Sequence, residues 1–153
     1  MPSIAFAQQS SPCSTEQHRQ FVFWLGNWQV YANNKLAGYN RIELAHNGCV
    51  LTEHYTTPAG FSGQSLNTYN AATGQWHQTW MDNAGTLLLL NGGLQDGAMV
   101  MSGEGVSPSG QPVIHRITWT PNEDGSVRQH WQATAVDKEN WQTVFDGLYK
   151  KQQ

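Results

Sequence analysis

Apolar residues early in the chain change from a helical to an alternating spacing. The positions i, i+3, i+4 and i+7 of a helical stripe are occupied by Phe21, Trp24, Leu25 and Trp28. Ser14 and Gln17 fit a capping box at the start of this stripe, and Gly26 can adopt the left-handed conformation that ends a helix. From Trp28 onward apolar and polar residues alternate, as in a strand with one buried face. The segment therefore predicts a short N-terminal helix that leads directly into a first strand.

After Gly26 the chain consists of short strand-like runs separated by turn residues. The breaks are Asn33–Asn34, His46–Gly48, Pro58–Gly60, Thr73–Gly74, Asn83–Gly85, Asp96–Gly97, Pro108–Gly110, Pro121–Gly125 and Asp137–Asn140. About ten candidate strands remain, at the spacing of an antiparallel meander. A two-sheet sandwich needs longer crossovers, for which only Gly103–Gln111 has the length, whereas a barrel needs only hairpin turns and has no exposed edges. The sequence therefore predicts an all-β fold, an up-and-down antiparallel barrel of about eight to ten strands with one short N-terminal helix.

The first residues have features of an export signal. Ala5-Phe6-Ala7, followed by Gln8, has the small-x-small form of a signal-peptidase site. No charged segment or full apolar segment precedes it, so residues 1–13 are interpreted as an export-signal remnant and linker, and residues 14–150 as one domain. The alternative is an accidental match.

The two cysteines also favour export. Cys13 and Cys49 are the only cysteines, and a single pair in an exported chain predicts one disulfide between the N-terminal arm and an early hairpin. Two unrelated thiols are the alternative. Together with the candidate signal-peptidase site, the pair predicts a periplasmic or secreted protein.

Composition excludes several classes of protein. Only 12% of the 153 residues are charged, yet seven Trp, five Tyr and five Phe supply ample core material, so the chain is not disordered. A polar, weakly charged and aromatic-rich chain is typical of secreted all-β proteins. The eight basic residues are scattered, so we expect no nucleic-acid partner. The longest aliphatic run, Leu87–Leu90, is far too short to span a membrane.

Five segments carry a resemblance to a known superfamily. Phe23–Trp28 resembles the Gly-x-Trp entry of lipocalins and fatty-acid-binding proteins, and the chain as a whole is similar to uncharacterised, secreted, lipocalin-like bacterial proteins of this calycin superfamily. The other similar segments are Gly48–Glu53, Trp76–Asp82, His115–Pro121 and Val144–Tyr149. The resemblance spans about Phe21 to Lys150 and implies a lipocalin-like barrel with a side-chain-lined interior, but no activity. Val136–Asn140 departs from the Gly-rich turn often found there, which leaves the shape of the last hairpin open.

The position of the aromatic residues predicts which face of each strand lines the barrel interior. Alternate side chains point to opposite faces, and large aromatics lose most by facing water. The inward set is then Tyr39, Arg41 and Glu43; Leu51, Glu53 and Tyr55; Ser65, Asn67 and Tyr69; Trp76, Gln78 and Trp80; Val113, His115, Ile117 and Trp119; Gln129, Trp131 and Ala133; and Trp141, Thr143, Phe145 and Tyr149. On the Arg41 strand, Ile42 and Leu44 favour the opposite face, and both choices stay open.

This choice of face predicts an aromatic interior with a few polar groups, which is typical of a small-molecule cavity. The candidate ligand-binding residues are Arg41, Glu53, Asn67, Tyr69, Gln78, Trp80, His115 and Trp131. We therefore predict a small-molecule-binding barrel with an apolar or aromatic ligand in its interior. The alternative is a filled core in which the polar groups satisfy one another, with Arg41 and Glu53 as a buried ion pair.

No catalytic motif is present in the sequence, so no catalytic residue, metal site or cofactor is predicted. Whether the protein is an enzyme stays open: Glu53 and His115 could act as the acid and base of an isomerase or cyclase. Sugar binding would need several Trp on one open surface. A haem ligand would have to be one of the lone histidines, His54, His77, His115 or His130. Neither the ligand nor the oligomeric state is predicted.

Overall fold

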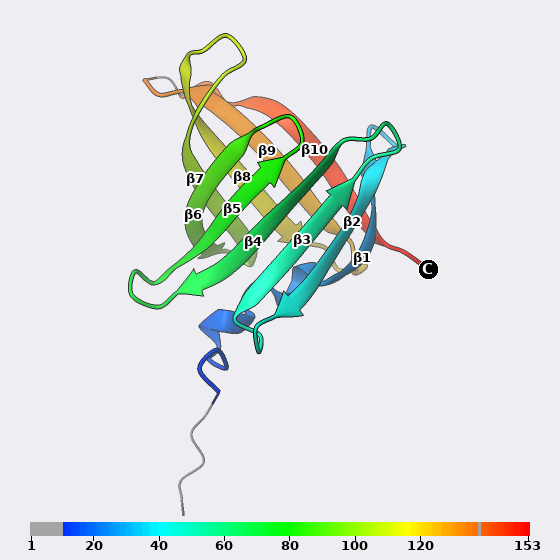
Figure 1. Ribbon diagram of the computed structural model, residues 1–153, viewed down its shortest axis with the longest axis vertical. Helices are drawn as coiled ribbons and strands as arrows, with labels where there is room; N and C mark the ends of the chain where they lie inside the picture. Colours follow the sequence, from blue (N-terminus) through cyan, green and yellow to red (C-terminus); the bar gives the residue numbers. More distant parts are fainter. Residues whose placement is uncertain (1–10, 138) are drawn as a thin grey trace, which may run out of the picture.

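Ten antiparallel strands follow one another around a closed barrel in a computed structural model that describes residues 11–137 and 139–153 (Figure 1). The strands are β1 Gly26–Ala32, β2 Lys35–Ala45, β3 Val50–Thr56, β4 Ser62–Asn70, β5 Gln75–Asp82, β6 Leu87–Gln95, β7 Ala98–Val106, β8 Pro112–Pro121, β9 Val127–Ala135 and β10 Gln142–Lys151. Each strand pairs with the next, and β1 pairs with β10 to close the barrel. The predicted up-and-down barrel is confirmed.

Tight turns make this consecutive pairing possible. Asn33 and Asn34, between β1 and β2, have φ values of 51° and 61°, and Asp96 and Gly97, between β6 and β7, have 49° and 82°. Positive φ at both central residues is the requirement of the two-residue turn whose twist matches antiparallel strands. Asn, Asp and Gly tolerate this conformation best, so these turn residues set the strand boundaries.

The predicted N-terminal helix is present as two short 3-10 turns, η1 Gln17–Arg19 and η2 Val22–Trp24, which lie across one end of the barrel (Figure 1). The predicted capping box is wrong, because Ser14 Oγ donates to the carbonyl of Ser11 at 2.7 Å instead of capping the turn. Phe21, between the two turns, has a non-helical backbone, so the chain changes direction there. Phe21 and Trp24 thereby both point into the barrel and are fully buried.

Aromatic rings close this end of the barrel. Phe21 stacks on Trp24 with a centroid distance of 4.8 Å, and Trp119 and Trp76 meet Phe21 edge-on at 5.1 and 5.7 Å. Trp28 is 1% exposed, and its indole Nε1 donates to the Trp24 carbonyl at 2.8 Å. We call these five residues the aromatic plug. The predicted burial of Trp28 under the N-terminal helix is confirmed.

A disulfide holds the plug segment against the barrel. Cys13 and Cys49 are bonded, with a Cα–Cα distance of 5.1 Å, which ties the N-terminal arm to the turn between β2 and β3. The predicted disulfide is confirmed, and it indicates an oxidising compartment. The candidate signal-peptidase site at Ala5-Phe6-Ala7 lies outside the described residues.

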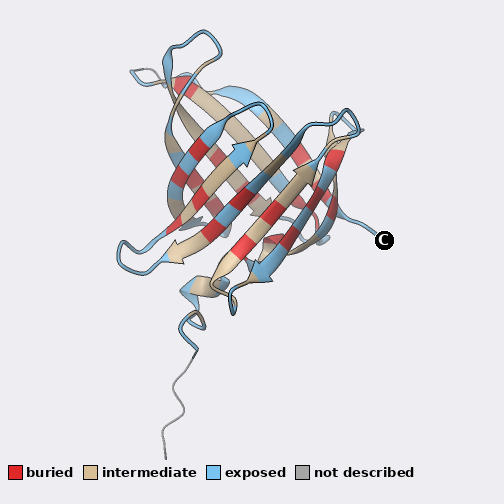
Figure 2. Ribbon diagram, viewed as in Figure 1, coloured by how far each residue is buried: buried red, intermediate tan, exposed pale blue. Residues whose placement is uncertain are grey.

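Buried and less buried residues alternate along the strands (Figure 2). The predicted inner face is correct on β3, β4, β5, β8 and β9. It is wrong on β2, where Asn40 and Ile42 are both 2% exposed and face the interior. Arg41 therefore lies on the outer face, where its Nε is 3.3 Å from Glu43 Oε1 and both side chains are more than half exposed. The Arg41–Glu53 ion pair of the filled-core alternative does not form.

The predicted inner face is also wrong at the start of β10. The register with β9 shifts between Thr143 and Phe145, so that residues before and after this bulge occupy opposite faces. Trp141 lies outside, 3.9 Å from the guanidinium of Arg116, and Thr143 Oγ1 lies outside at 3.0 Å from His130 Nε2. Phe145 and Tyr149 face the interior as predicted.

Candidate ligand cavity

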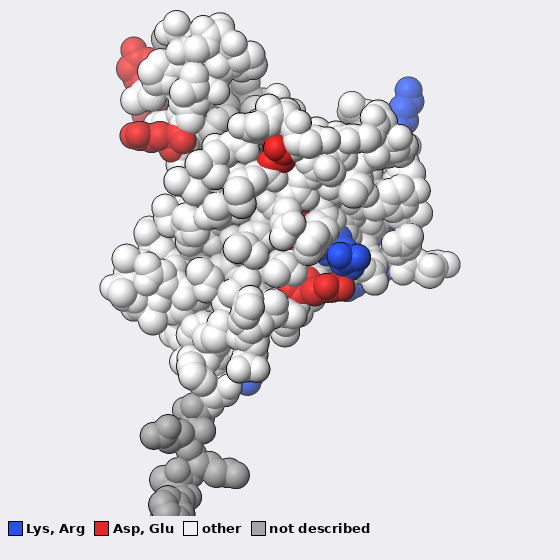
Figure 3. Space-filling model, in the orientation of Figure 1, with Lys and Arg blue, Asp and Glu red and all other residues white. Residues whose placement is uncertain are grey.

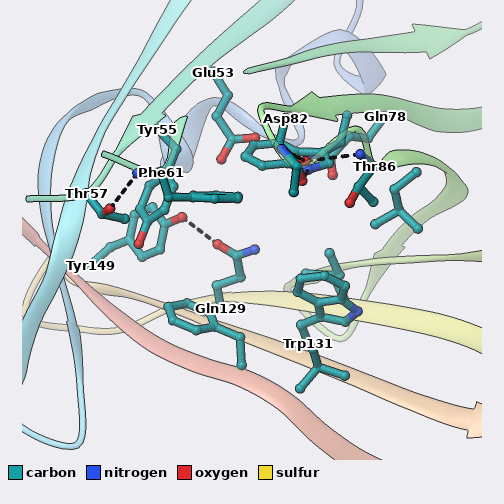
Figure 4. A pocket seen from close by; sticks show the side chains of 16 residues that line it. Glu53, Tyr55, Thr57, Phe61, Gln78, Asp82, Thr86, Gln129, Trp131 and Tyr149 are labelled. Carbon is teal, nitrogen blue, oxygen red and sulfur yellow. Dashed lines mark hydrogen bonds between the residues drawn. The ribbon is translucent and has the colours of Figure 1, made fainter. Parts of the chain in front are cut away.

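A cavity of about 420 Å³ occupies the half of the barrel opposite the aromatic plug. Figure 4 shows the side chains that line it. It extends to the end of the barrel formed by the β3–β4 and β5–β6 loops. Its lining consists of Glu53, Tyr55, Thr57, Phe61, Gln78, Trp80, Asp82, Ala84, Thr86, Leu88, Ile117, Gln129, Trp131, Val144, Phe145 and Tyr149. The lining therefore has polar groups at the base, mostly apolar walls and a polar mouth.

Glu53 is the charged group at the base of the cavity, where it is 4% exposed. Its Oε2 accepts a hydrogen bond from Asn40 Nδ2 at 2.7 Å, and its Oε1 accepts one from Ser65 Oγ at 2.6 Å. Burial raises the pKa of Glu53 to about 6, although the hydrogen bonds from Ser65 and Asn40 oppose the shift. The carboxyl group can therefore gain or lose a proton near neutral pH.

Two branches of hydrogen bonds extend from Glu53. On β4 and β5, Asn67 Nδ2 donates to Ser65 Oγ at 2.8 Å, and Gln78 Nε2 donates to Asn67 Oδ1 at 2.8 Å. These bonds fix the amide of Gln78 at the cavity surface. They also give the buried side chains of Ser65 and Asn67 hydrogen-bond partners inside the protein. The network explains why neutral polar residues occupy interior positions of both strands.

The second branch crosses the barrel. Asn40 Nδ2 donates to the hydroxyl of Tyr149 at 2.9 Å, and that hydroxyl donates to Gln129 Oε1 (Figure 4). Burial, followed by the nearby charge of Glu53, raises the pKa of Tyr149 well above its usual value. The same two causes raise the pKa of Tyr55. Both phenols therefore stay protonated.

Five aromatic rings line the cavity above this base, and we call them the aromatic wall: Tyr55, Phe61, Trp80, Trp131 and Phe145. Trp80 is held by Asp82, whose Oδ2 accepts from the indole Nε1 at 2.9 Å. The other oxygen of Asp82 accepts from the amides of Ala84 and Thr86. Burial alone would raise the pKa of Asp82, but the hydrogen bonds from Trp80, Thr86 and Ala84 outweigh it and lower the pKa. Asp82 therefore holds the Trp80 ring and the β5–β6 turn at the cavity mouth in fixed positions relative to each other.

Two glycines make room for rings of this wall. A Cβ on Gly63 would lie 2.2 Å from the Trp80 ring, and a Cβ on Gly38 would lie 2.6 Å from the Tyr55 hydroxyl. Each ring therefore covers the glycine of the neighbouring strand and lies along the wall instead of across the interior. Side chains at these two positions would displace the rings.

His115 lies behind the wall. Its Nδ1 accepts from the indole Nε1 of Trp131 at 3.0 Å, and burial lowers its pKa. Among the residues that the structure describes, His115 does not line the cavity, whereas Glu53 does. The structure therefore does not bring the proposed acid–base pair together in one cavity, and it gives His115 a role in orienting Trp131.

Four of the predicted ligand-binding residues line the cavity: Glu53, Gln78, Trp80 and Trp131. Asn67 and His115 lie one hydrogen bond behind them. Tyr69 faces the plug, with its ring 6.1 Å from Trp76. The placement of Arg41 in the interior was wrong.

The predicted ligand-binding set did not include Asn40, Gln129 and Tyr149, which belong to the hydrogen-bond network of Glu53. The sequence of β2 did indicate Asn40, because Asn40 lies on the same face of the strand as Ile42, and that face was the open alternative. Gln129 and Tyr149 were placed on the inner face, but no sequence pattern shows that they meet across the barrel.

The alternatives from the sequence have less support. Four of the seven Trp are in the plug, Trp80 and Trp131 line the cavity, and Trp141 lies outside, so no open surface carries several Trp. Within residues 11–137 and 139–153, no three His, Cys, Asp or Glu side chains are grouped to hold a metal ion. No helix in the same residues is long and apolar enough to cross a membrane. The face in Figure 3 carries few, scattered charges.

No protein-family model matches the chain, and no curated protein matches it. The function therefore has to be inferred from the cavity itself.

Proposed function

We propose that this protein is a periplasmic or secreted, lipocalin-like barrel that binds a small apolar or aromatic ligand in its cavity. The observation that carries the proposal is a cavity of about 420 Å³ with five aromatic rings above a hydrogen-bonded polar base. Small-molecule sites have this volume and this combination of apolar walls with a few orienting polar groups. The disulfide supports a location outside the cytoplasm.

The main alternative is a core that only satisfies its own polar groups. The network around Glu53 does join Asn40, Ser65, Asn67 and Gln78 to one another. It does not fill the space above them, and rings such as Trp80 and Tyr55 line that space. A protein selected only for a stable core would gain from filling it, because a cavity of this size costs packing energy.

Binding of the neutral dye N-phenyl-1-naphthylamine, followed by its fluorescence, tests the proposal. We expect a blue-shifted, saturable signal with the native protein and its loss in Leu88→Trp, because Leu88 lines the cavity and a larger ring would fill it. Leu87→Trp is the matched control, since Leu87 is the residue before Leu88 and is 60% exposed. Circular dichroism must show that both variants are folded. Equal dye binding by the two folded variants would refute the proposal.

A further inference from the structure

The charged groups in the cavity are all acidic. Glu53 lies at its base and Asp82 near its mouth, and no Lys, Arg or His is among the described residues that line it. Asp82 is occupied by the Trp80 indole and two backbone amides. Glu53 is therefore the charge that a bound ligand would meet.

The carboxylate at the base of the cavity also has capacity to accept further hydrogen bonds. Each oxygen of Glu53 accepts one hydrogen bond from the protein and, as a carboxylate oxygen, retains capacity for another. The side-chain amide of Gln78 also lines the base, and its Nε2 is already used by Asn67 Oδ1. The donors that the lining offers near Glu53 are Nε2 of Gln129, whose Oε1 accepts from Tyr149, and the hydroxyl of Tyr55. A ligand group that donates hydrogen bonds would use this remaining capacity of Glu53.

The aromatic wall favours the same kind of ligand. The faces of Trp and Tyr rings attract cations, and Trp80, Trp131 and Tyr55 line the same cavity as Glu53. Tyr55 and Trp131 lie on two sides of the space next to Glu53 in Figure 4. An ammonium group would therefore meet a carboxylate below it and aromatic rings beside it. A carboxylate ligand would meet the charge of Glu53 with no cation to compensate it.

We propose that the cavity selects hydrophobic amines, with the protonated nitrogen on Glu53 and the apolar body against the aromatic wall. This inference rests on the proposed ligand-binding function and adds the chemical class of the ligand. A charge-assisted hydrogen bond to Glu53 supplies the selectivity, and the wall supplies the contact area. Neutral alcohols would bind more weakly. A hydroxyl can donate to Glu53 and accept from Gln129, but it carries no positive charge.

Three naphthalenes with the same body test the inference by isothermal titration calorimetry at pH 7.5: 2-(1-naphthyl)ethylamine, 2-(1-naphthyl)ethanol and 1-naphthylacetic acid. We expect the amine to bind about tenfold more tightly than the alcohol, and the acid about tenfold more weakly than the alcohol. If the alcohol binds and the amine binds no better, the inference is wrong and the proposed function stands. If none of the three binds and the dye does not bind, the proposed function itself fails.

Glu53→Gln identifies the group responsible. We expect this variant to lose at least about tenfold in affinity for the amine and to change little for the alcohol. Glu43→Gln is the matched control, because Glu43 is exposed on the outer face next to Arg41. Equal amine affinity in folded Glu53→Gln and in Glu43→Gln would contradict the assignment to Glu53.

The pH dependence of amine binding to the native protein gives a second measurement that does not depend on a variant. The titratable groups near Glu53 are Tyr55 on β3 and Tyr149 on β10, which stay protonated, while Asn40 on β2 and Ser65 on β4 are uncharged. Because the pKa of Glu53 is about 6, amine affinity should fall about tenfold between pH 7.5 and pH 5, while alcohol affinity falls less. Amine affinity that is independent of pH over this range, with the protein folded throughout, would overturn the inference.

Discussion

His115 accepts a hydrogen bond at Nδ1 from the indole N–H of Trp131, with 3.0 Å between the two nitrogens. An accepting Nδ1 requires the neutral imidazole that carries its proton on Nε2, because a protonated histidine has two donors and no acceptor. The lowered pKa of His115 favours the same neutral form. The position of one ring of the aromatic wall therefore depends on the protonation of a residue outside the cavity.

Acidification should disturb Trp131 through His115. The folded pKa of His115 is below its ordinary value of 6.5, so the unfolded chain binds this proton more readily, and the stabilising contribution is lost as the pH falls below about 6.5 and through the folded pKa. We expect a change in Trp fluorescence over this interval that is absent in His115→Leu. Leaving the indole N–H without an acceptor should cost that variant about 1–3 kcal/mol of unfolding free energy at pH 7.5. If Trp fluorescence in His115→Leu changes with pH in the same way as in the wild type, this prediction is wrong.

Glu53 should affect stability with the opposite sign. Its folded pKa of about 6 is above the ordinary value of 4.5, so its contribution is most favourable below pH 4.5 and is lost as the pH rises through 6. A glutamine side chain cannot ionise, so the unfolding free energy of Glu53→Gln relative to wild type should increase by about 2 kcal/mol from pH 4.5 to pH 7. Urea unfolding across this range measures the difference, in which the shared contribution of His115 cancels. A constant difference between the two proteins would show that the carboxyl is not desolvated.

The aromatic plug should contribute strongly to stability through Trp28. Trp28→Ala removes a fully buried ring and its hydrogen bond to the Trp24 carbonyl, so we expect a loss of about 3–5 kcal/mol in urea unfolding. Trp141→Ala is a suitable control, because Trp141 stacks on Arg116 outside the barrel and should cost less than about 1 kcal/mol. Similar losses in the two variants would mean that Trp28 is not a buried anchor.

The disulfide should stabilise the barrel by constraining the unfolded chain. Cys13 and Cys49 are 36 residues apart, and closing a loop of this length is expected to contribute about 2–4 kcal/mol. Urea unfolding of the Cys13→Ser/Cys49→Ser double variant measures this contribution. Intact-mass analysis after alkylation without reductant checks the bond in protein made in an oxidising compartment. Two alkylated thiols there would contradict the assigned disulfide.

Local patterns were sufficient to predict the barrel. The strand boundaries follow from turn residues such as Asn33–Asn34 and Asp96–Gly97, whose positive φ values suit tight hairpins. The plug was predictable in part, because the spacing of Phe21 and Trp24 marks two side chains on one face. The break between η1 and η2 was not predictable, because it depends on how the rings of Phe21 and Trp24 fit the end of the closed barrel.

The candidate site was less predictable, because it depends on contacts between distant strands. The aromatic rule placed Tyr39 and Arg41 inside, although burying Arg41 would have required a buried partner for its charge. The structure instead buries Asn40, a neutral donor that reaches both Glu53 and Tyr149. The β10 bulge that turned Trp141 outward is a difference in register with β9, and the sequence of one strand alone does not encode it.

The aromatic plug also determines which end of a bound molecule would enter the cavity first and which end would leave first. Because Phe21, Trp24 and Trp119 seal one end, a ligand held by Glu53 would enter with its nitrogen first and leave with its apolar body first. A molecule longer than the cavity would keep that body exposed between the β3–β4 and β5–β6 loops. Release would then begin at the exposed body, before the contact with Glu53 is broken.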